Sequence, residues 1–269
     1  MASEEGFISH LIELRSRVMK ATLAVVVMFL VVAFGWPGSQ LLYSVFAEPM
    51  LAALPQDGQM IATDVVGVFL VPLKVAALAG FVLALPVVLY QAWAFVAPGL
   101  YTHEKRLVLP LVLTSFVLFL IGMAFAYFLV FPVVFAFMSA VAPEGVAWMT
   151  DIEKYFGFAL TTFFAFGLTF EVPVVVIVLV RMGVVSIDKL KAARPYVIVG
   201  AFILAAVFTP PDVISQFMLA VPLCLLYELG IVLSKFISRP VGESDWKPLT
   251  DEEMERELDR SEQQSGEAK

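Results

Sequence analysis

The chain has 269 residues, of which 61% are hydrophobic and 15% are charged. Soluble domains average about 45–50% apolar and about 25% charged residues, so this composition excludes a soluble globular enzyme and indicates a membrane protein with several spans. The net charge of −7 belongs mainly to residues 240–269, where ten acidic residues outnumber four basic ones and predict a disordered tail.

Six runs with few or no charges are predicted to be membrane-spanning helices, because about 20 apolar residues cross a bilayer core of about 30 Å. The fold class is therefore all-α, a polytopic membrane protein whose six-helix domain occupies residues 1–239. The predicted spans are residues 21–36, 67–96, 104–139, 154–181, 195–209 and 213–235.

The segment before the first span, residues 6–20, is predicted to form an amphipathic helix with one apolar stripe. Glu13 and Arg17 are four residues apart in the order that favours an ion pair within a helix. Such a pair contributes about 0.3–0.5 kcal/mol, and it is the simplest structural role for Glu13.

The loop between the first two spans, residues 37–64, has apolar residues at helical spacing. This spacing predicts a short helix along the outer membrane surface. Pro49 and Pro55 are expected to break or bend it, because proline cannot donate a backbone hydrogen bond.

Four long spans contain an internal proline, namely Pro86, Pro132, Pro173 and Pro222. Each proline removes a backbone hydrogen bond and favours a kink. Kinked helices predict a concave bundle; the alternative is that these are ordinary membrane-helix prolines without a shared purpose.

The fifth span is short, since residues 195–209 give 15 residues and a length of roughly 22 Å. The turn Pro210-Pro211-Asp212 then reverses the chain, and Asp212 is predicted to cap the sixth span. We expect the last two spans to thin the bilayer locally on the outer side.

The orientation follows from lysine and arginine, which are retained on the cytoplasmic side of a membrane. One side of the predicted topology carries only Lys154, with Lys74 close to the start of the second span. Both termini are therefore predicted to be cytoplasmic, because the other side carries Arg15, Arg17, Lys20, Lys105, Arg106, Arg181, Lys189, Lys191, Arg194, Lys235 and Arg239.

Glu171 is a carboxylate in the middle of the fourth span, roughly 15 Å from the cytoplasmic boundary. An intramembrane carboxylate is costly and usually faces a cavity or a partner. We expect it to be protonated or in contact with water. The alternative is an internal hydrogen bond to Thr or Ser on a neighbouring helix, and Thr161, Thr162 and Thr169 are candidates in the same span. Glu228, near the inner end of the sixth span, is expected to reach the lipid headgroups.

The sequence lacks the common catalytic and cofactor motifs. One cysteine, Cys224, and two histidines, His10 and His103, provide no metal cluster. The chain has no P-loop, no H-E-x-x-H and no G-x-S-x-G motif. We therefore expect no enzyme activity, no cofactor, no metal site and no nucleic-acid partner.

Six short motifs spread over residues 7–238 together resemble the TatC family, the multi-spanning receptor component of the twin-arginine protein translocase. Their number and common order make the resemblance specific, and residues 240–269 fall outside it. The motifs are His10-Leu11-Ile12-Glu13-Leu14-Arg15, Trp93-Ala94-Phe95-Val96-Ala97-Pro98-Gly99-Leu100, Glu104-Lys105-Arg106, Phe170-Glu171-Val172-Pro173, Arg194-Pro195-Tyr196 and Thr209-Pro210-Pro211-Asp212.

The resemblance implies that Glu13 and Glu104 bind the paired arginines of a signal peptide at the cytoplasmic face, with Phe95 beside them. Leu14, Arg15 and Arg17 are expected to support this site. A carboxylate accepts two parallel hydrogen bonds from a guanidinium, a geometry that lysine cannot reproduce.

The resemblance also implies contacts with partners in the bacterial inner membrane. Glu171, Asp212, Gln216 and Pro49 are expected to contact single-span TatA and TatB proteins or to take part in assembly. Membrane lipid and self-association in the complex are further expectations, and export is expected to use the proton-motive force.

The alternative function is a secondary transporter of a small solute that uses Glu171 as its coupling carboxylate. Matching broken helices in the two halves would favour it, and the sequence shows no such repeat. An intramembrane hydrolase is disfavoured, since the spans offer no nucleophile–base pair.

Overall fold

The computed structural model describes residues 2–35, 38–53, 60–96, 108–141, 149–209 and 212–237. Six helical stretches in this part of the chain are long and apolar enough to span a membrane, which confirms the predicted fold class and number of spans. The elements in chain order are α1 (Ala2–Phe34), α2 (Ser39–Ala53), α3 (Gly67–Val96), α4 (Val108–Phe125), the π-helical segment η3 (Ala126–Val130), α5 (Phe131–Val141), α6 (Ile152–Phe170), α7 (Val172–Arg181), α8 (Ile187–Phe208) and α9 (Val213–Ile237).

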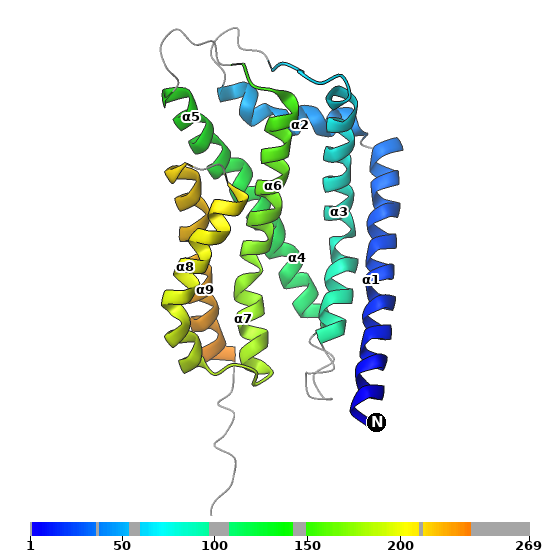
Figure 1. Cartoon of the computed structure of the whole chain (residues 1–269), viewed down its shortest axis with the longest axis vertical. Coiled ribbons are helices and arrows are strands. Elements are labelled where there is room, and N and C mark those ends of the chain that lie inside the picture. Colours follow the sequence, from blue (N-terminus) through cyan, green and yellow to red (C-terminus); the bar gives the residue numbers. More distant parts are fainter. Residues whose placement is uncertain are drawn as a thin grey trace, which may run out of the picture.

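The bundle has two edges and a middle layer (Figure 1). Helices α1 and α3 form one edge, α4–α5 and α6–α7 cross the middle, and α8 and α9 form the other edge. Ala2 and Ile237 lie at the same end, which we call the N-terminal end; α2 runs across the opposite, far end.

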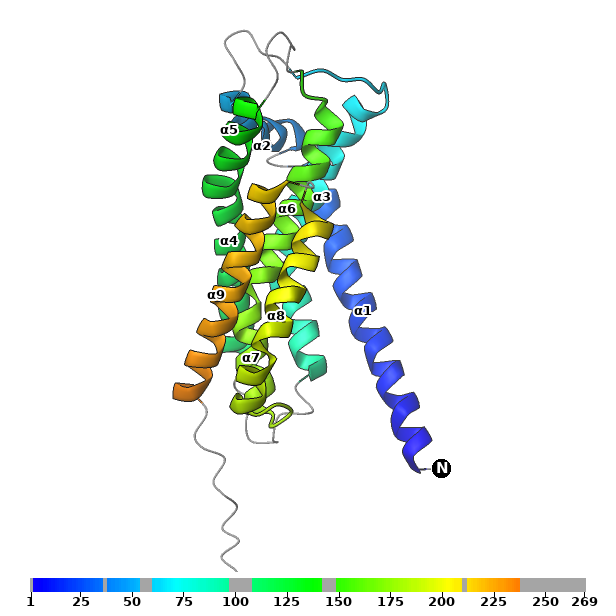
Figure 2. The same ribbon diagram turned by 60° about the vertical axis from the view of Figure 1, so that its left-hand side comes forward.

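Helix α1 is one continuous helix that includes the predicted amphipathic segment and residues 21–34 of the predicted first span. It packs against α3, and its N-terminal end leans away from the rest of the bundle (Figure 2). Gly80 of α3 permits this packing, because a Cβ at Gly80 would lie 2.6 Å from both the Cα and the N atom of Phe29. The α1–α3 contact therefore determines where the N-terminal part of α1 is held.

Helix α2 continues through Pro49 to Ala53, so Pro49 does not break it, and a bend there remains a prediction. Pro55 lies outside the described residues. Pro49 cannot donate a hydrogen bond to the carbonyl oxygen of Val45 four residues earlier. That oxygen instead accepts a hydrogen bond of 3.0 Å from the Tyr127 hydroxyl. The Tyr155 hydroxyl donates to the Phe46 oxygen at 2.6 Å, so two tyrosines of the bundle anchor the helix.

The internal prolines differ in their local effect on the helices. The π-helical segment η3 ends two residues before Pro132, which cannot bond to the Phe128 carbonyl. Helices α6 and α7 are separated at Glu171, two residues before Pro173. Helices α3 and α9 continue through Pro86 and Pro222. The expected kinks and the concave shape remain predictions.

Helix α6 forms the centre of the hydrophobic core. Its Phe156, Phe163 and Phe166 are each at most 2% exposed. The ring of Phe163 meets the ring of Phe131 edge-to-face, with 5.0 Å between the centroids. Such aromatic pairs add about 0.5–1.5 kcal/mol beyond burial, so α6 is a rigid support for the helices around it.

Helix α8 begins at Ile187, eight residues before the start of the predicted fifth span. The Ser186 side chain caps it by accepting a hydrogen bond from the Lys189 N–H, and a first turn capped this way tolerates charged residues outside the apolar run. Figure 1 shows α8 and α9 meeting well short of the far end of α6. Local thinning of the bilayer at this place remains a prediction.

The segments before α3 and before α6 are joined at the far end of the bundle. The backbones of Ile61 and Asp151 form an isolated parallel bridge. Asp151 caps α6 through two backbone N–H groups and also accepts hydrogen bonds from the hydroxyl and the N–H of Thr63. Lys74 of α3 pairs with Glu153 of α6 at 2.6 Å.

We expect this junction to weaken in acid. Hydrogen bonds from the Thr63 hydroxyl and the Lys154 N–H, in that order, lower the pKa of Asp151 from 3.8 to about 2. The carboxylate therefore stabilises the fold fully above pH 3.8, and this contribution is lost as the pH falls through about 2. Thermal unfolding of Asp151→Asn should lack this pH-dependent component while the cap is retained at neutral pH. Identical pH profiles for the wild type and the variant would contradict the assignment.

Candidate functional site

The first candidate site lies at the N-terminal end, where α1 meets the last turn of α3. Glu13 and Arg17 follow His10 by three and seven residues, so the three side chains share one face of α1. The His10 ring stacks on the Phe95 ring with centroids 4.4 Å apart and an interplanar angle of 23°. The face of α1 that carries Glu13 therefore meets the part of α3 that carries Phe95.

The Glu13 carboxylate pairs with Arg17, as the sequence predicts. Both Nε and Nη2 of Arg17 donate to the same oxygen, Oε1, at 2.9 and 2.6 Å. The side chains of Arg17 and Glu13 are 24% and 38% exposed. Oε2 of Glu13 makes no hydrogen bond with any described residue, so half of the carboxylate's accepting capacity is unused there.

The other predicted residues of this site are described only in part. Leu14 is exposed on α1, and Arg15 is exposed without an ion pair to a described residue. Glu104, the second predicted carboxylate, lies outside the described residues. Its proximity to Glu13 therefore remains a prediction.

Glu171 forms the second candidate site, at the break between α6 and α7. It is only 8% exposed, and neither carboxylate oxygen has a hydrogen-bond partner among the described residues. Ser115 of α4 is the neighbouring hydroxyl, and it is itself buried. The Ser115 oxygen accepts a 3.0 Å hydrogen bond from Nε1 of Trp93, so α3 and α4 meet beside the carboxyl group.

The threonines proposed as partners of Glu171 do not fill that role. The Thr169 hydroxyl donates to the Ala165 carbonyl, and the Thr161 hydroxyl donates to the Gly157 carbonyl, each within α6. The Thr162 hydroxyl is buried without a described partner. Threonine hydroxyls in helices readily bond to the carbonyl four residues earlier, which explains why Thr161 and Thr169 do not reach Glu171.

Glu171→Leu is expected to raise the thermal unfolding midpoint in detergent. A buried polar group without a partner costs about 1–3 kcal/mol, and leucine of similar volume removes this cost. Scanning calorimetry or a fluorescence melt measures the shift, with Glu171→Gln as the polar control that should not gain stability. A lower midpoint for the leucine variant would indicate a polar partner.

Asp212, Gln216 and Pro49 are the remaining residues predicted to contact partners. Asp212 caps α9, since its Oδ1 accepts a 2.8 Å hydrogen bond from the Ser215 N–H, as predicted. Gln216 is half-buried one turn into α9, and Pro49 is half-buried in α2. These residues lie on different elements: Glu13 on α1, Pro49 on α2, Glu171 between α6 and α7, and Asp212 and Gln216 at the start of α9.

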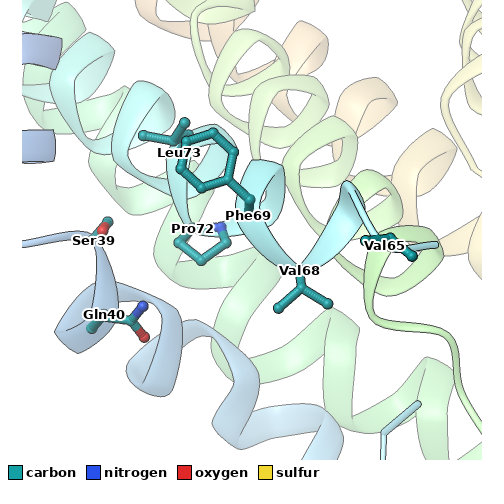
Figure 3. A pocket seen from close by; sticks show the side chains of 7 residues that line it. All are labelled: Ser39, Gln40, Val65, Val68, Phe69, Pro72 and Leu73. Carbon is teal, nitrogen blue, oxygen red and sulfur yellow. The ribbon is translucent and has the colours of Figure 1, made fainter. Parts of the chain in front are cut away.

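A cavity of about 390 Å³ lies at the far end between the starts of α2 and α3. Figure 3 shows Ser39 and Gln40 of α2 facing Phe69 and Pro72 of α3 across it. Its walls are mostly apolar, and it contains none of the predicted site residues. Among the described residues, no group of three or more His, Cys, Asp or Glu side chains is placed to hold a metal ion.

Sequence reasoning missed three contacts between helices. These are the His10–Phe95 stack, the Lys74–Glu153 pair, and the pair of Arg194 with Glu228 at 2.6 Å. Glu228 therefore has an ion-pair partner on α8 instead of only reaching toward headgroups. For the Lys74–Glu153 and Arg194–Glu228 pairs, the sequence does carry a signal. In each pair, opposite charges lie at the same predicted depth in two different spans.

The fold and these sites define a multi-pass α-helical membrane protein with a carboxylate site at one end and a buried carboxyl group in its interior. Residues 9–222 match the TatC family, described as Sec-independent protein translocase protein. The chain belongs to this family, which places it in Sec-independent protein transport.

Individual relatives agree with this assignment. The Sec-independent protein translocase protein TatC of Halothiobacillus neapolitanus is 50% identical over 231 residues, which cover 86% of this chain and 62% of that protein. The protein of the same name from Escherichia coli K12 is 48% identical, covering 86% and 89%. A crystal structure of a twin arginine translocase receptor, TatC, matches with a TM-score of 0.75 at 35% identity, covering 86% of this chain and all of that one.

Proposed function

We propose that this chain is the receptor and scaffold of a twin-arginine translocase, and that it recognises twin-arginine signal peptides through Glu13 and Glu104. The observation that carries the proposal is the stack of His10 on Phe95, because His10 lies one turn before Glu13 on the same face of α1. Membership of the TatC family supports it. Binding and positioning, and no catalysis, are the activities we assign to the chain.

The chemistry of two carboxylates suits two neighbouring guanidinium groups. Each charge-assisted hydrogen bond contributes roughly 1.5–3 kcal/mol before the discount for exposure. Two pairs then give about 3–6 kcal/mol, which corresponds to weak binding. The apolar part of a signal must add affinity. Leu11, Leu14 and Val18 of α1 are between 38% and 52% exposed near Glu13 and offer an apolar surface for it.

We place the N-terminal end in the cytoplasm of a bacterium, with the chain in the inner membrane. Arg15, Arg17 and Lys20 lie on the part of α1 at this end, and Lys235 lies near the end of α9. Positively charged residues remain on the cytoplasmic side. The observation that Ala2 and Ile237 share this end supports a cytoplasmic location for both termini.

We assign Glu171, Asp212, Gln216 and Pro49 to contacts with single-span TatA and TatB proteins or with other copies of the chain. The unpartnered carboxyl group of Glu171 supports this role, because an unpaired polar group in a membrane helix favours a partner. Export is then driven by the proton-motive force. The family match gives no support to the alternative of a small-solute transporter.

The direct test is a pull-down with the purified chain in detergent. A folded precursor with a twin-arginine signal should be retained, and the same precursor with two lysines should be retained much less, because an ammonium group cannot form the bidentate contact. Equal retention of both precursors would refute the proposed recognition.

A further inference from the structure

We propose that Arg17 is a resident competitor for the Glu13 carboxylate and thereby sets the affinity threshold that an arginine-containing signal must exceed. This inference rests on the proposed function, since it concerns the same carboxylate. It assigns Arg17 a role opposite to simple support of the site: the arginine occupies Glu13 until a ligand replaces it.

The geometry of the pair supports competition. Nε and Nη2 of Arg17 both donate hydrogen bonds to Oε1 of Glu13. An incoming guanidinium would use the same kinds of donor atoms. A bidentate ligand needs both carboxylate oxygens, one for each parallel N–H group. Oε2 is available with respect to the described residues, but Oε1 is occupied. A signal arginine must therefore displace Arg17 to make its full contact.

The position of Arg17 makes this occupation persistent but reversible. Arg17 is the less exposed member of the pair and shares a helix face with His10, which stacks on Phe95. Glu13 and Arg17 are one helical turn apart, so their ion pair forms without any change in α1. A partly exposed pair of this kind is weak enough for a ligand to break.

When a signal arginine displaces Arg17, one guanidinium replaces another on the Glu13 carboxylate. The ligand guanidinium regains the two charge-assisted bonds that Arg17 gives up, and it adds the contacts of the rest of the signal. A lysine ligand regains fewer bonds from its compact ammonium group. The resident arginine therefore raises the threshold for every ligand, and a lysine-containing signal is left with too little binding energy to cross it.

The test is a titration of a fluorescent twin-arginine signal peptide against the full-length chain in nanodiscs. Arg17→Gln should bind the peptide about two- to fivefold more tightly, the range expected from loss of an exposed ion pair. Arg17→Lys keeps the positive charge but loses the paired N–H donors of the guanidinium. Its affinity for the peptide should lie between those of Arg17→Gln and the wild type. Weaker binding by Arg17→Gln would overturn the proposal and make Arg17 a positioning residue.

A control variant separates competition from a general charge effect. Lys20→Gln removes one positive charge from the same helix, three residues further on, and Lys20 has no ion pair with a described residue. Its affinity should remain close to that of the wild type. Tightening equal to that of Arg17→Gln would overturn competition, because charge alone would then explain both results.

A second measurement distinguishes failure of this inference from failure of the proposed function. The ¹⁵Nε–¹H resonance of Arg17 should shift and exchange faster with water when the peptide binds, since the guanidinium is released. Peptide binding with an unchanged Arg17 resonance overturns only the competition. A wild-type chain that binds twin-arginine and twin-lysine peptides equally overturns the proposed function and this inference together.

Discussion

Glu104→Gln and Glu13→Ala are each expected to weaken binding of a twin-arginine signal by about tenfold while leaving the fold intact. A charge-assisted pair contributes roughly 1.5–3 kcal/mol, and partial exposure reduces this toward the lower value, which corresponds to about a tenfold change. Glu13 is 38% exposed, so its removal leaves no buried group unpaired. Site-specific crosslinking of a labelled signal peptide measures the loss.

Glu153→Gln is the matched control for these carboxylate variants. Glu153 has the same 38% side-chain exposure as Glu13 and is also held in an ion pair, with Lys74, but it lies at the far end of the bundle. Its signal crosslinking should equal that of the wild type. Unchanged crosslinking of the signal to both Glu104→Gln and Glu13→Ala would contradict the assignment of the two carboxylates.

Gly80→Ala is expected to destabilise the chain and to impair signal binding together. The added Cβ would lie 2.6 Å from backbone atoms of Phe29, and backbone cannot rotate away as a side chain can. Overpacking of this kind costs about 1–3 kcal/mol. Because α1 packs mainly on α3, relief of the clash must move α1 and thus separate His10 from Phe95. Thermal melts and signal crosslinking measure the two effects.

Gly200→Ala provides the control for this substitution. Gly200 lies within α8, and beyond its own turn of helix a Cβ there would meet no atom of the described residues within 4 Å. The exchange should leave stability and signal binding unchanged or slightly improve stability, since alanine favours a helix more than glycine does. A stable Gly80→Ala variant with normal signal binding would show that α1 tolerates displacement and that its packing does not position Glu13.

The sequence alone determined the features of this chain that depend on a single helix or a single turn. The number of spans follows from run length and polarity, which reflect the thickness of a bilayer. The Glu13–Arg17 pair and the Asp212 cap depend on residues within one turn of each other, so helix geometry alone brings them together.

The contacts between helices were decided only by the tertiary structure. No spacing rule predicts that His10 meets Phe95, or that Val45 of α2 finds a replacement donor in Tyr127 and thereby tolerates Pro49. Glu171 shows the same limit. Two of its three predicted threonine partners, Thr161 and Thr169, bond to their own helix, and Trp93 of α3 and Ser115 of α4 meet beside it. Run length and periodicity describe single helices, whereas the rotation and depth of each helix arise from the packing of side chains across the bundle.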